Sequence, residues 1–141
     1  MADGFFFEDL SVGQTASFAK TITEADILMF TAVSGDTNPV HIDAEAAAKS
    51  MFKQRIAHGM LSASLISTVL GTRLPGPGTI YLAQNLKFRA PVTIGSTVTA
   101  TVVVTALDAE KKRATFSTIC TVAGKPVIEG DATVMVPSRA S

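Results

Sequence analysis

An aspartate and a histidine stand close together in the segment Asp36-Thr-Asn-Pro-Val-His41. Pro39 disfavours a helical conformation at the residue before it, so it fixes the turn and limits where the two side chains can point. A carboxylate and an imidazole held near each other can take up and return a proton, which makes them candidates for general acid–base catalysis. The alternative is a plain turn between two helices, in which Asp36 and Asn38 only form the turn.

A second candidate lies in Ala57-His-Gly-Met60, which is typical of a helix start. Gly59 lacks a Cβ, so a ligand carbonyl could approach the unpaired N–H groups there, where the helix dipole favours negative charge. Ser62, one turn further, could touch the same ligand, or its hydroxyl could bond back to a helix carbonyl. His58 could equally be a surface or packing residue. A proton-handling pair beside an anion site suits the addition of water to an activated double bond.

Other chemistries fit the sequence less well. Asp36, His41, Asp43 and His58 include possible metal ligands, but the two histidines are seventeen residues apart, which matches no compact ligand spacing. The sequence has no Gly-x-Ser-x-Gly elbow, and it has no phosphate-loop or dinucleotide fingerprint. We therefore expect no metal and no cofactor.

The composition narrows the class of protein. Of 141 residues, 47% are hydrophobic, and twelve basic residues balance twelve acidic ones, so neither nucleic acid nor a membrane surface is an expected partner. The single cysteine, Cys120, rules out an internal disulfide framework and lies in a strand-like run, which predicts a buried thiol. No signal peptide and no bilayer-spanning run are evident, so we expect a cytoplasmic protein.

Helices are expected in the first half of the chain. Thr23-Glu-Ala-Asp26 resembles a capping box, and the helix that follows it should bury one stripe of side chains and end near Gly35. That predicted stripe consists of Ile27, Phe30 and Val33. A short helix should follow the N-cap Asp43 and reach about Ser50. Residues 60–70 are apolar on all sides with only small polar residues between, which predicts a helix enclosed by the fold and ended by Gly71.

Strands are expected at residues 15–22 and through the second half of the chain. Val, Ile, Thr and Phe dominate four further runs, which turn residues separate: 79–88, 96–107, 114–122 and 126–136. Short connections between them predict an antiparallel meander. Helices early and strands late favour an α+β fold, with a helix packed on one face of the sheet. We expect one domain over residues 1–141.

The two motifs together resemble a known signature. Asp36-Thr-Asn-Pro-Val-His41 followed by Ile56-Ala-His-Gly-Met-Leu-Ser62 is similar to the MaoC-like hydratases, most closely the (R)-specific enoyl-CoA hydratases. Residues 7–13 resemble the family's opening strand and turn, and 85–92 resemble its central strand, so the likeness covers nearly the whole chain. It implies a hot-dog fold, in which a curled antiparallel sheet wraps a central helix. It also implies a homodimer with acyl-CoA sites near the subunit interface.

The resemblance also implies an activity and roles for residues. The reaction would be reversible hydration of trans-2-enoyl-CoA to (R)-3-hydroxyacyl-CoA, with CoA as part of the substrate, in fatty-acid metabolism that feeds polyhydroxyalkanoate synthesis. Asp36 and His41 would be catalytic, Gly59 would supply the oxyanion N–H, Asn38 would brace the loop and Ser62 would contact the thioester or pantetheine. A dehydratase of acyl-carrier-protein thioesters, a hot-dog acyl-CoA thioesterase and a non-catalytic acyl-CoA-binding subunit are the alternatives.

Overall fold

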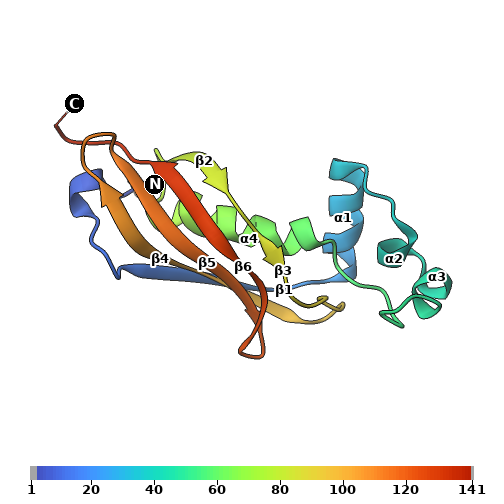
Figure 1. Cartoon of the computed structure of the whole chain (residues 1–141). Coiled ribbons are helices and arrows are strands. Elements are labelled where there is room, and N and C mark those ends of the chain that lie inside the picture. Colours follow the sequence, from blue (N-terminus) through green and yellow to red (C-terminus); the bar gives the residue numbers. More distant parts are fainter. Residues whose placement is uncertain (1–2, 141) are drawn as a thin grey trace.

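The computed structural model describes residues 3–140. Within the described residues, the four α-helices all lie between the first and second strands of the chain, so helices and strands alternate little (Figure 1). The helical elements are η1 (Phe7–Asp9), α1 (Glu24–Ser34), α2 (Pro39–Ile42), α3 (Ala44–Ala48) and α4 (Gly59–Thr72). The strands are β1 (Thr15–Thr21), β2 (Ile80–Gln84), β3 (Lys87–Phe88), β4 (Thr97–Asp108), β5 (Arg113–Val122) and β6 (Lys125–Met135).

The strands form one antiparallel sheet in the order β1-β4-β5-β6-β2, and β3 also pairs with β6. β4, β5 and β6 are consecutive neighbours, which confirms the predicted meander for these three strands. The prediction is wrong for the run at 79–88, which pairs with β6 and not with β4. The strand expected at residues 79–88 is instead two short strands, β2 and β3. A Cβ at Gly130 on β6 would collide with the carbonyl of Asn85, so the chain between the two strands lies against β6 at a position that has no side chain.

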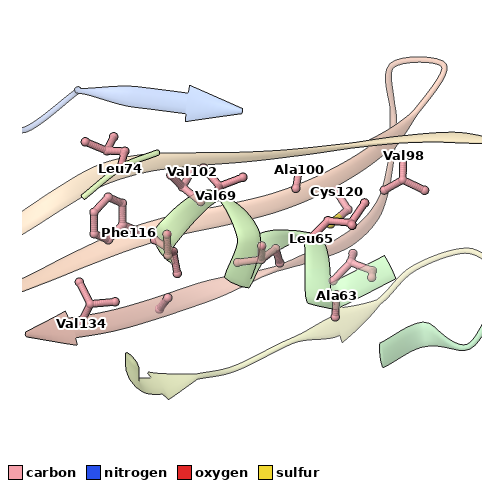
Figure 2. Packing of buried hydrophobic residues seen from close by; sticks show 14 of the residues in the cluster. Ala63, Leu65, Val69, Leu74, Val98, Ala100, Val102, Phe116, Cys120 and Val134 are labelled. Atoms are coloured by element: carbon pink, nitrogen blue, oxygen red, sulfur yellow. The ribbon is translucent and has the colours of Figure 1, made fainter. Parts of the chain in front are cut away.

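Helix α4 packs against this sheet and carries the core (Figures 1 and 2). Its buried apolar side chains meet inward-facing residues of β4, β5 and β6, including the fully buried Phe116. A helix enclosed by a curled antiparallel sheet is the expected α+β hot-dog arrangement. The enclosure is incomplete, however, because Met60 remains 57% exposed. Gly71 does not end the helix, which continues to Thr72 and is followed by Arg73 as C-cap.

Cys120 on β5 is fully buried in this core, as predicted. Its thiol lies 3.7 Å from the Ser62 carbonyl, to which it donates. Desolvation raises the pKa of this thiol to about 11, so it stays protonated and unreactive in the folded protein.

Helices α1, α2 and α3 lie together at one end of α4 (Figure 1). The capping box at the start of α1 is confirmed, since Thr23 and Asp26 bond reciprocally, and Gly35 ends the helix with a φ of 78°. The predicted buried stripe is wrong in part. Ile27 is buried, but Val33 is 88% exposed. Each step of three residues falls about 60° short of a full helical turn. Val33, six residues after Ile27, therefore points about 120° away from it and leaves the buried face.

Two details implied by the resemblance differ in the structure. Residues 7–13 hold the 3₁₀ helix η1 and the implied turn, at residues 12–13, but not the implied strand. Within residues 85–92 only Lys87 and Phe88 are in a strand, and β3 lies off the main path of the sheet and not at its centre. Among the described residues, no helix is long and apolar enough to cross a membrane.

Candidate active site

The loop after α1 carries Asp36 and is built from local hydrogen bonds. The Asp36 carboxylate accepts the backbone N–H of Asn38 at 3.2 Å, and the Asn38 side-chain oxygen accepts the N–H of Val40 at 3.2 Å. Asn38 is thus the N-cap of α2, and Pro39 occupies the first position of that helix, where its missing N–H costs nothing. The Asp…His spacing therefore spans a cap and one helical turn, and Asn38 braces that turn.

His41 lies on α2 and is buried, with 8% of its surface exposed. Its Nδ1 is 2.9 Å from the carbonyl oxygen of Ile56. Because a carbonyl only accepts, Nδ1 carries a proton, and Nε2 is the ring nitrogen left for another partner. The Arg55 side chain donates to the His41 carbonyl at 2.7 Å and pairs with Glu24 on α1, so the loop is also tied from outside.

The structure brings Asp36 and His41 together, with His58 as a third member. One ligand-type atom from each residue lies within 4.8 Å of those of the other two. A water molecule that donates to two acceptors can bridge a separation of about 5 Å, since each bond measures about 2.8 Å. Asp36 is exposed while the two histidines are buried, so the carboxylate is the member that solvent reaches first.

The same three residues could be considered as a metal site. The rings of His41 and His58 are stacked, with centroids 4.0 Å apart and planes inclined by 28°. Lone pairs lie in the ring planes, so stacked rings direct them side by side, whereas a zinc site needs nitrogens that converge to about 2.0–2.1 Å from one ion. The geometry favours packing over chelation, and the expectation of no metal stays a prediction.

The start of α4 leaves backbone donors free. Leu61 N–H bonds to the carbonyl of His58 at 3.0 Å, whereas the N–H groups of Gly59 and Met60 have no acceptor within residues 3–140. A Cβ at Gly59 would lie 2.7 Å from the ring of Phe88, so only glycine lets that ring pack this close to the helix start. Free donors at the positive end of a fourteen-residue helix are an arrangement that favours a bound anion.

Ser62 adds a polar group near the same helix start. The residue is 1% exposed, and its hydroxyl oxygen has no hydrogen-bond partner among the described residues. The alternative, a bond back to a helix carbonyl, is therefore wrong for this serine. It does hold for Ser64, which donates to the Leu61 carbonyl at 2.6 Å. A buried hydroxyl without a partner costs about 1–3 kcal/mol, so a ligand that bonds to it recovers that cost.

An apolar cleft of about 440 Å³ opens beside Gly59 and Ser62. Its walls come from the loop before α4, from β3 and the residues after it, and from β6. They include Phe52, Ile56, Phe88, Pro91 and Ile128. Asp36 and His41 do not line this cleft, but Ile56 does, and its carbonyl holds His41. The start of α4 and the Asp36–His41 pair thus adjoin across one residue, Ile56.

Sequence reasoning did not assign His58 to the site. Its side chain is 2% exposed and does not cap α4, although His58 occupies the N-cap position. It turns back instead toward the Asp36 loop. One signal in the sequence could have identified it. His58 directly precedes Gly59, so its side chain must lie next to the N-terminus of the predicted helix.

The fold and the site define the class to which this chain belongs. Residues 9–131 match the model of the MaoC-like domain, and the chain belongs to the MaoC-like family. It is 66% identical over 134 residues to the (R)-specific enoyl-CoA hydratase of Rhodospirillum rubrum, covering 95% of this chain and 93% of the relative.

Two solved structures share the fold. The unliganded R-hydratase PhaJ1 of Pseudomonas aeruginosa is 46% identical, with a TM-score of 0.91 over 96% of this chain and 88% of that one. The (R)-hydratase of Aeromonas caviae, described as involved in PHA biosynthesis, is 45% identical, with a TM-score of 0.89 over 92% and 99%. These likenesses agree with the hot-dog fold that the resemblance implied.

Proposed function

We propose that this chain is an (R)-specific enoyl-CoA hydratase, a hydro-lyase that adds water reversibly to trans-2-enoyl-CoA and forms (R)-3-hydroxyacyl-CoA. The observation that carries the proposal is the placement of an Asp36–His41 pair beside a helix start with two free N–H groups. The 66% identity to a hydratase over nearly the whole chain supports the substrate class and the configuration of the product.

The acid–base pair would hold the attacking water. With Nδ1–H committed to Ile56, His41 Nε2 accepts one hydrogen of the water, and the Asp36 carboxylate accepts the other. As the water oxygen bonds to C3, the C2–C3 π electrons move toward the thioester oxygen and one water proton passes to Asp36. The pair then returns a proton to C2, so that one molecule of water is added in total. Dehydration uses the same groups in reverse.

The start of α4 would stabilise the charge that this addition creates. The N–H of Gly59 faces the enolate-like thioester oxygen, where a single oxyanion donor typically contributes about 3–4 kcal/mol to the transition state. The Ser62 hydroxyl would contact the thioester region of the substrate, because Ser62 lines the cleft and its hydroxyl has no partner among residues 3–140. Asn38 would act indirectly, by holding the loop in shape.

We also propose that the chain forms a homodimer. Within residues 3–140, β2 pairs only with β6, which leaves its other edge open. Its three consecutive apolar residues Ile80, Tyr81 and Leu82 are all at least 40% exposed. An open apolar edge favours pairing with a second copy. Sedimentation should give twice the chain mass, and Leu82→Asp should give the monomer. A monomeric wild type would contradict the proposal. A cytoplasmic location and one domain over residues 1–141 stay predictions from the sequence.

The direct test of function follows the conjugated-thioester absorbance of crotonyl-CoA, with product configuration determined by an (R)-selective 3-hydroxyacyl-CoA dehydrogenase. Loss of absorbance with (R)-product and no free thiol is the expected result. Release of free thiol would favour a thioesterase. Activity only on the crotonyl thioester of acyl-carrier protein would favour the dehydratase of that substrate class, and binding without turnover would favour a non-catalytic subunit.

A further inference from the structure

We infer that His58 is a positioning residue, which holds Asp36 and His41 in their reacting geometry without touching the substrate. The inference rests on the proposed function, because it assigns a supporting role within that site. Two independent contacts of one buried imidazole carry it. One contact reaches the backbone of Asp36, and the other reaches the ring of His41.

The first contact is a hydrogen bond across the site. His58 Nε2 lies 3.1 Å from the carbonyl oxygen of Asp36 and 3.1 Å from Oγ1 of Thr31 on α1. The carbonyl accepts only, so Nε2 carries a proton and donates. Because Asp36 is exposed, this bond ties the backbone that carries its carboxylate to a buried residue, His58, directly before α4.

The second contact is the stack on His41. Ring centroids 4.0 Å apart leave no room for His41 to shift toward α4, and the ring of Phe30 packs against His58 at 4.8 Å. The hydrogen bond to the Ile56 carbonyl therefore fixes the orientation of the His41 ring, and the stack on His58 fixes its position. A misplacement of about 1 Å in a reacting group can lower a rate by about 10²-fold, so a residue that fixes both partners has large leverage on turnover.

The two bonds make a spectroscopic prediction that is independent of activity. His58 should be the Nε2–H tautomer, and His41 should be the Nδ1–H tautomer. The chain contains only two histidines, so each single variant leaves one imidazole and assigns both by subtraction. Long-range ¹H–¹⁵N spectra in mildly alkaline buffer should show opposite tautomers. The Nδ1–H tautomer at His58 would overturn the inference, whether or not the wild type hydrates crotonyl-CoA.

Three variants separate positioning from simple filling of space. His58→Phe keeps a ring under His41 but cannot donate, whereas His58→Gln can place an amide N–H near the position of Nε2. We expect the kcat of crotonyl-CoA hydration to fall at least tenfold in His58→Phe, with KM within twofold of wild type, and to recover to within threefold in His58→Gln. Thr31→Val removes the other partner of Nε2 and serves as the matched control, with kcat within threefold.

The outcomes are distinguishable from failure of the proposed function. A wild type that does not hydrate crotonyl-CoA contradicts the proposed function, and the tautomer spectra then decide the role of His58. An active wild type with undiminished His58→Phe overturns positioning alone. If His58→Phe does not fold, His58→Gln is compared with His58→Asn, whose shorter amide cannot reach the Asp36 carbonyl. Equal kcat in those two variants would also overturn the inference.

Discussion

Replacing Ser62 by alanine should stabilise the free protein while weakening its function. The hydroxyl is buried with no partner among the described residues, and such a group costs about 1–3 kcal/mol. Alanine removes that cost and gains about 0.5 kcal/mol of helix propensity over serine. Unfolding in urea should therefore show an increase of about 2 kcal/mol. A chain of this length should gain about 4–8 °C in Tm.

The same substitution should lower activity, because the hydroxyl would lose its bond to the bound thioester. A neutral hydrogen bond contributes about 0.5–1.5 kcal/mol, so kcat/KM for crotonyl-CoA should fall about two- to tenfold. Ser64→Ala is the matched control, since that hydroxyl is exposed and already bonded to Leu61. It should change Tm by less than half as much and leave kcat/KM unaltered. Destabilisation by Ser62→Ala would refute the reasoning, because it would mean that the hydroxyl has a partner in the free protein.

Two further variants test the oxyanion site and the helix before the loop. Gly59→Val should lower kcat by at least about 10²-fold, because its side chain would fill the approach to the free N–H groups and push against Phe88; circular dichroism should show a native fold, and unchanged kinetics would remove Gly59 from the mechanism. At neutral pH, Asp26→Asn should lower the free energy of unfolding by about 1 kcal/mol, since hydrogen bonds from Lys20 and the Thr23 backbone lower the pKa of Asp26 below 3.8. A carboxylate whose pKa is lowered by folding stabilises the fold at pH values above its pKa in the unfolded chain. Urea titrations should therefore show the stability difference between wild type and Asp26→Asn vanish as the pH falls through the pKa of Asp26 in the folded protein. A difference that persists in acid would contradict this cause.

Local patterns predicted much of the fold. The capping box at Thr23, the glycine after α1 and the N-cap at Asp43 depend on neighbours in sequence, and each appears in the structure. The enclosed helix was predictable because its residues are apolar around the axis. Its end was not, since Gly71 lies where a Cβ would meet nothing and the hydroxyl of Thr72 bonds back to Thr68. Gly71 lies on the open side of the helix, and the helix continues past it because the neighbouring Val69 and Leu70 are packed in the core.

The site was predictable where its parts are local and was missed where they are not. Asp36 and His41 are joined by a cap and one turn, so their spacing carries the signal. His58 reaches Asp36 across 22 residues and stacks on His41 only because α1, α2 and α4 meet at one end of the sheet. The free hydroxyl of Ser62 was equally hidden, because Ser62 and Ser64 share a helix and differ only in surroundings.

The central claim is that Asp36 and His41 share one water molecule beside the free start of α4. The most direct measurement is the kcat/KM of crotonyl-CoA hydration in wild type, Asp36→Asn, His41→Gln and the double variant, with Tm measured for each. Each single variant should lose about 10²–10⁴-fold with little change in Tm, and the double variant should lose little more than the worse single one. Losses that multiply in the double variant, or an Asp36→Asn enzyme within threefold of wild type, would contradict the account.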